Sequence, residues 1–136
     1  MLVKKLSGDM PLTGLLEKAQ ALHYPPGCGK ITVHSDPYAF QTMNFGVPLT
    51  KRGQDYVVGG TFAINSSKEK VGIEEHVSPG DAYLFFPSLW HGVDTIDPGL
   101  KADWNDVRGR WYLAGFTVQP HGVTNRLTAL GAELDL

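Results

Sequence analysis

A histidine and an aspartate stand two positions apart where a strand-like segment ends, as His34 and Asp36 in ITVHSDP. In extended chain successive side chains point to opposite faces, so these two project from the same side. An imidazole and a carboxylate on one face can bind one metal ion together. The triplet arises readily by chance, so its meaning depends on a third ligand elsewhere in the chain.

The segment PGDAYLFFPSLWHGV, residues 79–93, supplies a candidate third ligand in His91. A Pro-Gly-Asp turn leads into a nearly continuous apolar run, which predicts a buried strand. A proline and a short corner then lead to the histidine. The other histidines, His23, His76 and His121, have no such surroundings, and we expect them to be structural or exposed.

Two arginines are spaced by two in the late segment VRGRWYLAGFTV, and strand alternation predicts that Arg108, Arg110 and Tyr112 share a face. Arginine binds a carboxylate with two parallel hydrogen bonds and keeps its charge, so its position on a barrel strand indicates an anionic ligand inside. The pattern does not decide which arginine binds it. Either one could instead pair with Asp103 or Asp106 on the surface.

The composition favours a chain of short strands. Apolar residues make up 42% of the 136 residues, and sixteen glycines and nine prolines interrupt the sequence. The expected strands are LHYPPG, ITVHSD, FQTMNFGVPL, GGTFAIN, KVGIEEHV, DAYLFFP, HGVDTID and GRWYLAGFTV. Eight such strands can form a double-sheet jelly roll, so we expect one all-β domain over residues 1–136.

One helix is expected ahead of these strands. Leu12, Leu15, Leu16, Ala19 and Leu22 recur at helical spacing in PLTGLLEKAQAL, which predicts a short amphipathic helix packed outside the sheets. The tail TNRLTALGAELDL could add a last helical turn, although glycine within it weakens that prediction.

Charge and cysteine content narrow the partners and the compartment. The formal net charge is −2 and the basic residues form no run, which argues against nucleic acid. No stretch approaches the ~20 apolar residues of a membrane span. A single cysteine, Cys28, and an N-terminus without an apolar signal region favour the cytoplasm.

Taken in order, the H-x-D triplet, the distal histidine and the Gly-Arg pair resemble the non-haem Fe(II) and 2-oxoglutarate-dependent dioxygenases over about residues 23–119. YPPGCG, GGTFAI and PGDAYLFF are each similar to their counterparts in that family. The resemblance implies a cupin-like double-stranded β-helix as the core of this domain.

The resemblance also implies roles for individual residues. Three would bind Fe(II): His34, Asp36 and His91. Arg110 would bind the distal carboxylate of 2-oxoglutarate, with Arg108 as the alternative. Tyr112 would share that carboxylate, and Asn44 is a weaker candidate for contact with the co-substrate.

The implied chemistry needs a metal with open positions. Two imidazoles and one carboxylate leave three positions on Fe(II), two for the keto acid and one for O₂. Decarboxylation of 2-oxoglutarate to succinate and CO₂ would then accompany oxidation of a C–H bond in a small-molecule substrate. Because Asp36 is present, we expect hydroxylation or a related oxidation and not the halogenation of relatives with a small residue there.

Two other functions remain open. One is that of a metal-binding cupin that uses no 2-oxoglutarate, because PGDAYLFFPSLWH also resembles the second motif of such cupins. The other is a non-catalytic jelly-roll binding module. Against the family pattern, only about thirty residues precede His34 and the link NSSKEK is too short to roof the substrate. We therefore expect an open mouth, one completed by a second subunit or a separate chain, or a minimal or truncated enzyme.

Overall fold

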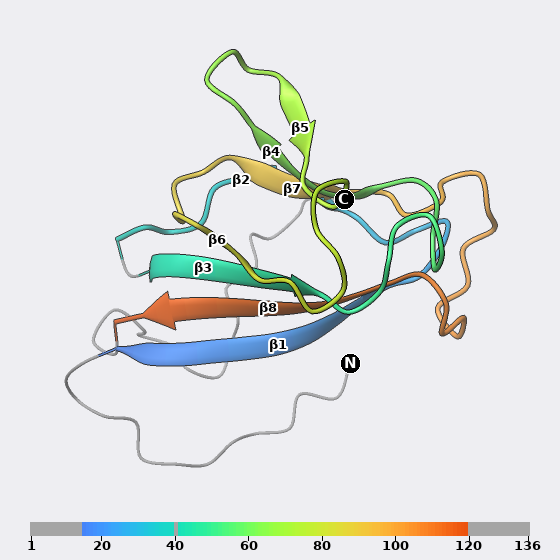
Figure 1. Cartoon of the computed structure of the whole chain (residues 1–136), viewed down its shortest axis with the longest axis horizontal. Coiled ribbons are helices and arrows are strands. Elements are labelled where there is room, and N and C mark those ends of the chain that lie inside the picture. Colours follow the sequence, from blue (N-terminus) through green and yellow to red (C-terminus); the bar gives the residue numbers. More distant parts are fainter. Residues whose placement is uncertain (1–14, 40, 120–136) are drawn as a thin grey trace.

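Eight strands form two four-stranded antiparallel sheets that pack together (Figure 1). The computed structural model describes residues 15–39 and 41–119. One sheet has the order β1 (Leu16–Tyr24), β8 (Arg110–Val118), β3 (Gln41–Pro48) and β6 (Tyr83–Phe85). The other has the order β2 (Ile31–His34), β7 (His91–Asp94), β4 (Gly60–Ile64) and β5 (Lys70–Gly72). The expected all-β class is confirmed, and the arrangement is consistent with a jelly-roll-like sandwich.

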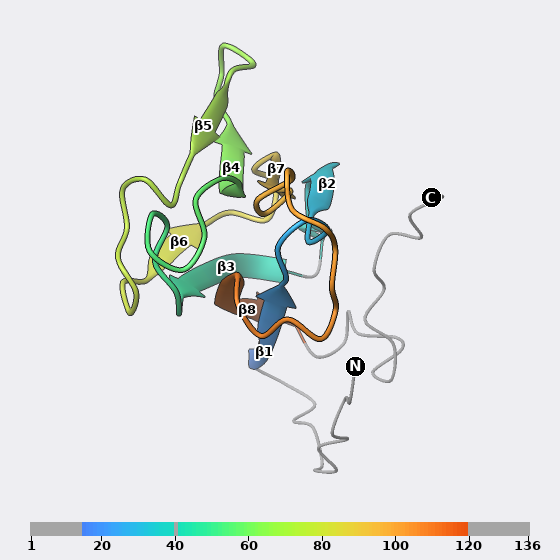
Figure 2. The ribbon, with the colours of Figure 1, turned by 90° about the vertical axis from the view of Figure 1, so that its right-hand side faces the viewer.

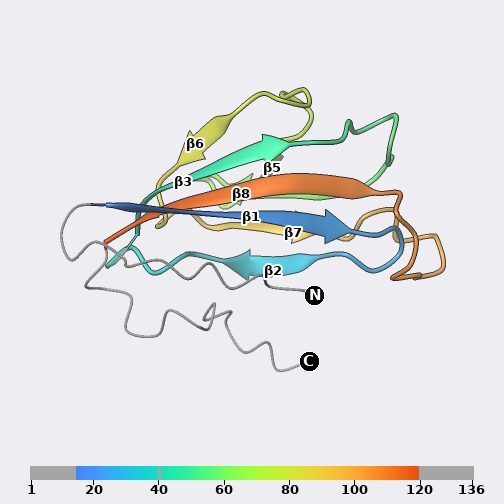
Figure 3. The same ribbon diagram turned by 90° about the horizontal axis from the view of Figure 1, so that it is seen from below.

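β8 is the longest inner strand of its sheet and lies between β1 and β3 (Figure 3). Its side chains alternate as a half-buried strand requires: Arg110, Tyr112 and Ala114 are buried, whereas Trp111 is exposed. The buried face of β8 therefore carries both an arginine and a tyrosine into the space between the sheets.

The interior is apolar in one part and polar in another. The apolar core is a cluster of six buried residues: Tyr24, Tyr56, Val93, Ile96, Tyr112 and Ala114. The buried polar residues are Asn44, Thr61, Glu74 and Arg110. Burying polar side chains costs free energy unless each finds a partner, so these four residues need hydrogen-bond partners inside the protein.

A tight hairpin joins β4 to β5 and projects from the body of the protein (Figure 2). Oδ1 of Asn65 accepts a hydrogen bond from the Glu69 backbone N–H at 2.9 Å, and its backbone oxygen accepts one from Lys68 at 3.0 Å. Lys68 adopts a left-handed conformation, with φ 62°. The NSSKEK link is thus a short turn between β4 and β5 and not an insertion that could cover a substrate.

The predicted N-terminal helix is wrong where the structure describes it. Residues 16–24 form β1, which pairs with β8 from Leu16 to Tyr24. The helical spacing of the leucines is overridden because nine residues of backbone pairing with an inner strand outweigh a weak local propensity. The start of that helix and the helical turn expected in the tail lie outside the described residues. The described part of the chain contains no helix with the length and hydropathy needed to cross a membrane.

The first expected strand, LHYPPG, overlaps β1 only at residues 22–24. The other seven expected strands are confirmed, each within its predicted segment. Runs of β-branched and aromatic residues separated by Gly, Pro, Asp and Asn were therefore sufficient to locate them.

Candidate functional site

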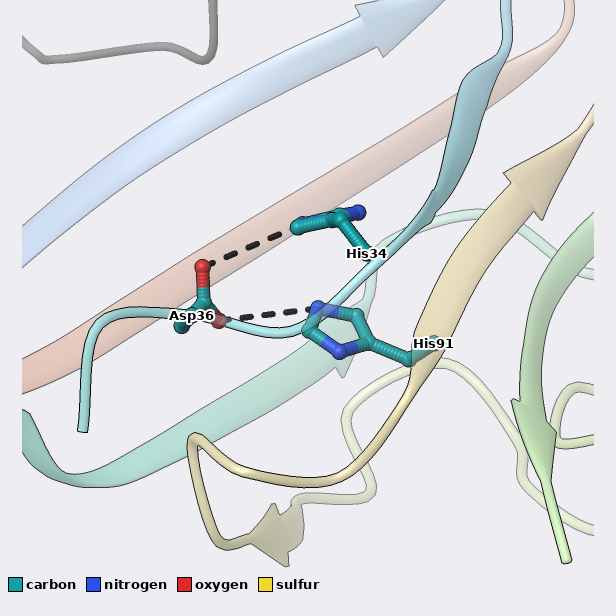
Figure 4. Close-up of side chains that lie close together, drawn as sticks. All are labelled: His34, Asp36 and His91. Atoms are coloured by element: carbon teal, nitrogen blue, oxygen red, sulfur yellow. Dashed lines mark ion pairs between the residues drawn. The ribbon is translucent and has the colours of Figure 1, made fainter.

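The two candidate histidine ligands lie side by side on neighbouring strands (Figure 4). His34 is the last residue of β2, His91 is the first residue of β7, and the two are partners in the register. Asp36 follows β2 by two residues, and its backbone N–H donates to the Pro87 carbonyl at 2.8 Å. That hydrogen bond ties the segment after β2 to the segment before β7, so all three side chains meet.

The ligand atoms are close enough to share one ion. Nε2 of His34 lies 3.8 Å from Oδ1 of Asp36, and Nε2 of His91 lies 3.6 Å from Oδ2. All the candidate ligand atoms lie within 4.8 Å of one another. With metal–ligand bonds of about 2.1 Å, two ligands at right angles are about 3 Å apart, so shifts of less than about 1 Å bring these atoms into place.

Both imidazoles are oriented for metal binding through Nε2. Nδ1 of His34 lies 2.8 Å from the Thr32 carbonyl oxygen, and Nδ1 of His91 lies 2.8 Å from that of Leu89. A carbonyl oxygen only accepts, so the neutral ring carries its proton on Nδ1 and keeps a lone pair on Nε2. Such a backbone partner is typical of histidines that bind metal.

The surroundings of His91 favour its neutral form. Burial lowers the pKa of His91 below its ordinary value, and the neighbouring His34 ring lowers it further. The Leu89 carbonyl and the Asp36 carboxylate act in the opposite direction and are outweighed. The edge of the Phe85 ring covers His91, with 4.9 Å between ring centroids. A neutral imidazole is the form that binds a metal, so this environment favours coordination.

Asn44 contacts the candidate metal ligand Asp36. Its Nδ2 donates to Oδ2 of Asp36 at 2.6 Å. Asn44 lies on β3 in the other sheet and is 1% exposed. The sequence makes this residue only a weaker candidate for contact with the co-substrate; the contact that the structure shows is with the Asp36 carboxylate.

Arg110 is buried between two tyrosine rings, with its guanidinium carbon 4.8 Å from the centre of Tyr24 and 4.1 Å from that of Tyr112. Its Nε donates to Oε1 of Glu74 at 2.5 Å, and Nη2 donates to Oγ1 of Thr61 at 2.6 Å. Nη1 is buried and has no hydrogen-bond partner among the described residues. Two of the three guanidinium nitrogens are therefore held by hydrogen bonds.

Tyr112 belongs to the same cluster. Its hydroxyl lies 2.7 Å from that of Tyr83, which in turn donates to Oγ1 of Thr61 at 3.2 Å. Burial raises the pKa of both tyrosines, so both remain neutral hydroxyls that can donate a hydrogen bond. This chain of hydroxyls lies beside the Arg110 guanidinium.

Arg108 does not share the buried face. It precedes β8, is exposed, and donates from Nη2 to Oδ2 of Asp106 at 2.6 Å, which holds the pKa of Asp106 at about 2. Gly109 has φ 104°, a left-handed conformation that breaks the strand alternation between the two arginines. The expected surface pairing with Asp106 is thus the one that Arg108 makes.

Sequence reasoning did not single out Glu74 or Thr61. Glu74 was read as part of the strand-like segment KVGIEEHV, but it follows β5 and is buried. No local signal separates it from Glu75, its exposed neighbour. Only the packing of the two sheets reveals that it pairs with Arg110.

His34, Asp36 and His91 thus form a group that could hold one metal ion in an all-β fold. The comparisons with known proteins add no family to this description: no protein-family model matches the chain, and no curated protein matches it.

Proposed function

We propose that the chain is an Fe(II)- and 2-oxoglutarate-dependent oxygenase that oxidises a C–H bond of a small organic substrate. The observation that carries the proposal is the group of His34, Asp36 and His91, in which the two Nε2 atoms lie 3.8 Å and 3.6 Å from the carboxylate oxygens. Bound Fe(II) would supply O₂ activation coupled to decarboxylation of 2-oxoglutarate into succinate and CO₂.

The donor set fits Fe(II). Two imidazoles and one carboxylate with further positions open are the ligands typical of non-haem Fe(II) oxygenases. The chain would supply three metal-binding side chains, and neighbouring groups would hold these side chains in position. Asn44 orients the carboxylate, and the Thr32 and Leu89 carbonyls orient the imidazoles.

The spacing between His91 and Arg110 supports 2-oxoglutarate as the co-substrate. His91 pairs with Ala63 on β4, and Thr61, which binds Arg110, lies two residues earlier on the same face. At about 3.4 Å per residue, the two levels are about 7 Å apart along the strand. With C–C bonds of about 1.5 Å, the five-carbon chain of 2-oxoglutarate spans about 5 Å between its terminal carbons. The two lengths are of the same order, which supports Arg110 as the residue that would bind the far carboxylate of a keto acid held at the metal.

The order of the elements supports the finer fold assignment as well. The candidate ligands at the end of β2 and the start of β7, followed by an arginine at the start of β8, keep the order of motifs on which the resemblance rests. We therefore include a cupin-like double-stranded β-helix in the proposal.

One observation favours a second candidate function, a metal-dependent cupin enzyme that does not use 2-oxoglutarate. Glu74 already pairs with Arg110, and both side chains are buried, at 4% and 1% exposure. Because the Glu74 carboxylate already offsets the charge of the Arg110 guanidinium, Arg110 would attract the carboxylate of 2-oxoglutarate less strongly.

Anaerobic addition of Fe(II) and 2-oxoglutarate tests the proposal. We expect the weak visible absorption band of a 2-keto acid chelated to Fe(II), lost in Asp36→Ala and retained in the matched control Asp94→Ala. Asp94 lies in an exposed pair with Lys70 on the far end of β7.

The same samples distinguish the alternatives. A chelator-reversible rise in melting temperature with metal, but no band with 2-oxoglutarate, would support the cupin enzyme. No effect of metal on melting temperature would contradict both and leave a binding module.

A further inference from the structure

Glu74 is the most heavily hydrogen-bonded buried carboxylate that the described residues contain. Oε1 accepts from Arg110 Nε at 2.5 Å, from the Thr61 backbone N–H at 3.1 Å and from the Thr61 hydroxyl at 3.0 Å. Oε2 accepts from the Tyr56 hydroxyl. A Cβ atom added at Gly60 would lie 2.5 Å from Oε2, so only glycine leaves room for this carboxylate. The side chain therefore has a closely fitted site of its own.

The contacts of Glu74 leave one nitrogen of Arg110 without a hydrogen-bond partner among the described residues. Glu74 takes Nε and Thr61 takes Nη2, while Nη1 is buried without a partner among the described residues. The flanking tyrosine rings hold the guanidinium plane. Nη1 is thus the nitrogen of Arg110 that a second carboxylate would bind while Glu74 stays in place.

Two carboxylates on one buried guanidinium repel each other. Opposite charges attract and like charges repel with similar strength at similar distances inside a protein, so the attraction of Arg110 for a ligand is largely offset by Glu74. An anion-binding site designed for tight binding would leave the arginine charge uncompensated. The buried pair therefore requires a reason beyond the binding of a carboxylate.

We propose that Glu74 is an internal counter-ion that weakens the affinity of Arg110 for a carboxylate ligand. It is a positioning residue and contacts neither the candidate metal ligands nor, in this arrangement, the ligand. The inference rests on the proposed function in naming 2-oxoglutarate as that ligand. Its consequence is a co-substrate affinity set lower than the arginine alone would give, so that turnover follows the concentration of the keto acid.

The test is the substitution Glu74→Gln, which keeps the shape of the side chain and removes its charge. Glu75→Gln is the matched control: it is the same change at the next residue, which is exposed and pairs with Arg52 at 3.1 Å. Two probes are used: 2-oxoglutarate with Fe(II) under anaerobic conditions, and glutarate with metal-free protein. Glutarate lacks the keto group and cannot chelate, so its binding reports the arginine alone.

We expect Glu74→Gln to bind both probes at least about tenfold more tightly than the wild type, and Glu75→Gln to bind them as the wild type does. Equal or weaker binding of glutarate by Glu74→Gln would overturn the inference; weaker binding would mean that Glu74 serves only to orient Arg110.

Loss of a buried partner can destabilise the fold, so a milder variant is included. Glu74→Asp keeps the charge but withdraws it by one methylene, and we expect binding between that of the wild type and that of Glu74→Gln. For each folded variant, the rise in melting temperature with glutarate should follow the same order. If Glu74→Gln does not fold, unchanged glutarate binding by Glu74→Asp overturns the inference.

The outcome for Glu74 is separable from that for the proposed function. Tighter glutarate binding without any Fe(II)–keto acid band would support the role of Glu74 and contradict use of 2-oxoglutarate. If the Fe(II)–keto acid band appears and depends on the 2-oxoglutarate concentration equally in the wild type and in Glu74→Gln, the result would support use of 2-oxoglutarate and contradict the role of Glu74.

Discussion

The side-chain amide of Asn44 donates a hydrogen bond of 2.6 Å to Oδ2 of Asp36, across the space between the two sheets. Asn44 is buried on β3, whereas Asp36 follows β2. This contact restrains the Asp36 carboxylate, which lies between the imidazoles of His34 and His91. It makes the opposite sheet part of the candidate metal site.

Replacing Asn44 with Ala should weaken metal binding by about 10- to 100-fold, because the loss of such an outer partner releases a ligand from its orientation. Metal titration by calorimetry measures the effect. Thr42→Ala is the control, since Thr42 is exposed on the same strand. Metal affinity equal to that of the wild type would show that Asp36 needs no such support.

Replacing Asp36 with Ala should abolish metal binding and turnover while leaving the metal-free fold intact. The carboxylate is a ligand by proposal, and its loss removes little packing volume. Circular dichroism and metal titration of the same preparation measure both properties. Normal activity in this variant would refute the ligand assignment.

The metal-free protein should lose stability as the pH falls below about 6.5. Burial lowers the pKa of His91 in the folded state, so below the ordinary value the unfolded chain binds more protons than the folded one. The contribution of His91 is therefore complete above pH 6.5 and is lost as the pH drops toward the lowered pKa.

Urea unfolding between pH 7.5 and pH 5 measures this dependence. His91→Gln should flatten it, and the same change at the exposed His76 is the control. An identical pH dependence in wild type and His91→Gln would contradict the assignment.

Replacing Arg110 with Leu should lower the free energy of unfolding by about 3 to 5 kcal/mol, because Glu74 would remain as a buried charge without its partner. The double variant with Glu74→Leu should recover much of that loss. Urea denaturation measures both. Arg108→Leu should have no measurable effect, since that pair is exposed. A stability of Arg110→Leu equal to that of the wild type would mean that the buried pair contributes nothing.

Light scattering of the purified chain, combined with a turnover assay, tests whether a second chain covers the candidate metal site. Tyr38, Phe86 and Trp90 are exposed and lie in the segments that carry the candidate ligands, at 72%, 69% and 55% exposure. If a second copy covers these side chains, the chain forms an assembly larger than a monomer. A strict monomer with full activity on a small metabolite would exclude the completed mouth.

Seven of the eight strand segments and the three candidate metal ligands could be predicted from the sequence. Strand alternation and turn residues are local properties, so the starts of β2 and β7 were predicted correctly from ITVH and from the proline corner before His91, whereas the predicted segments run past the ends of both strands. The order of the motifs then paired His34 and His91 before any register was known.

Tertiary structure alone decided what depended on distant partners. Residues 16–24 became a strand because β8 pairs with them, against their helical spacing. Arg110 and not Arg108 is buried because Gly109 turns the chain just before β8. Glu74 reaches Arg110 only when the two sheets pack together, since its charge is stabilised by groups on other elements. Local propensity acts over a few neighbouring residues, whereas pairing and burial depend on which distant residues share the same space.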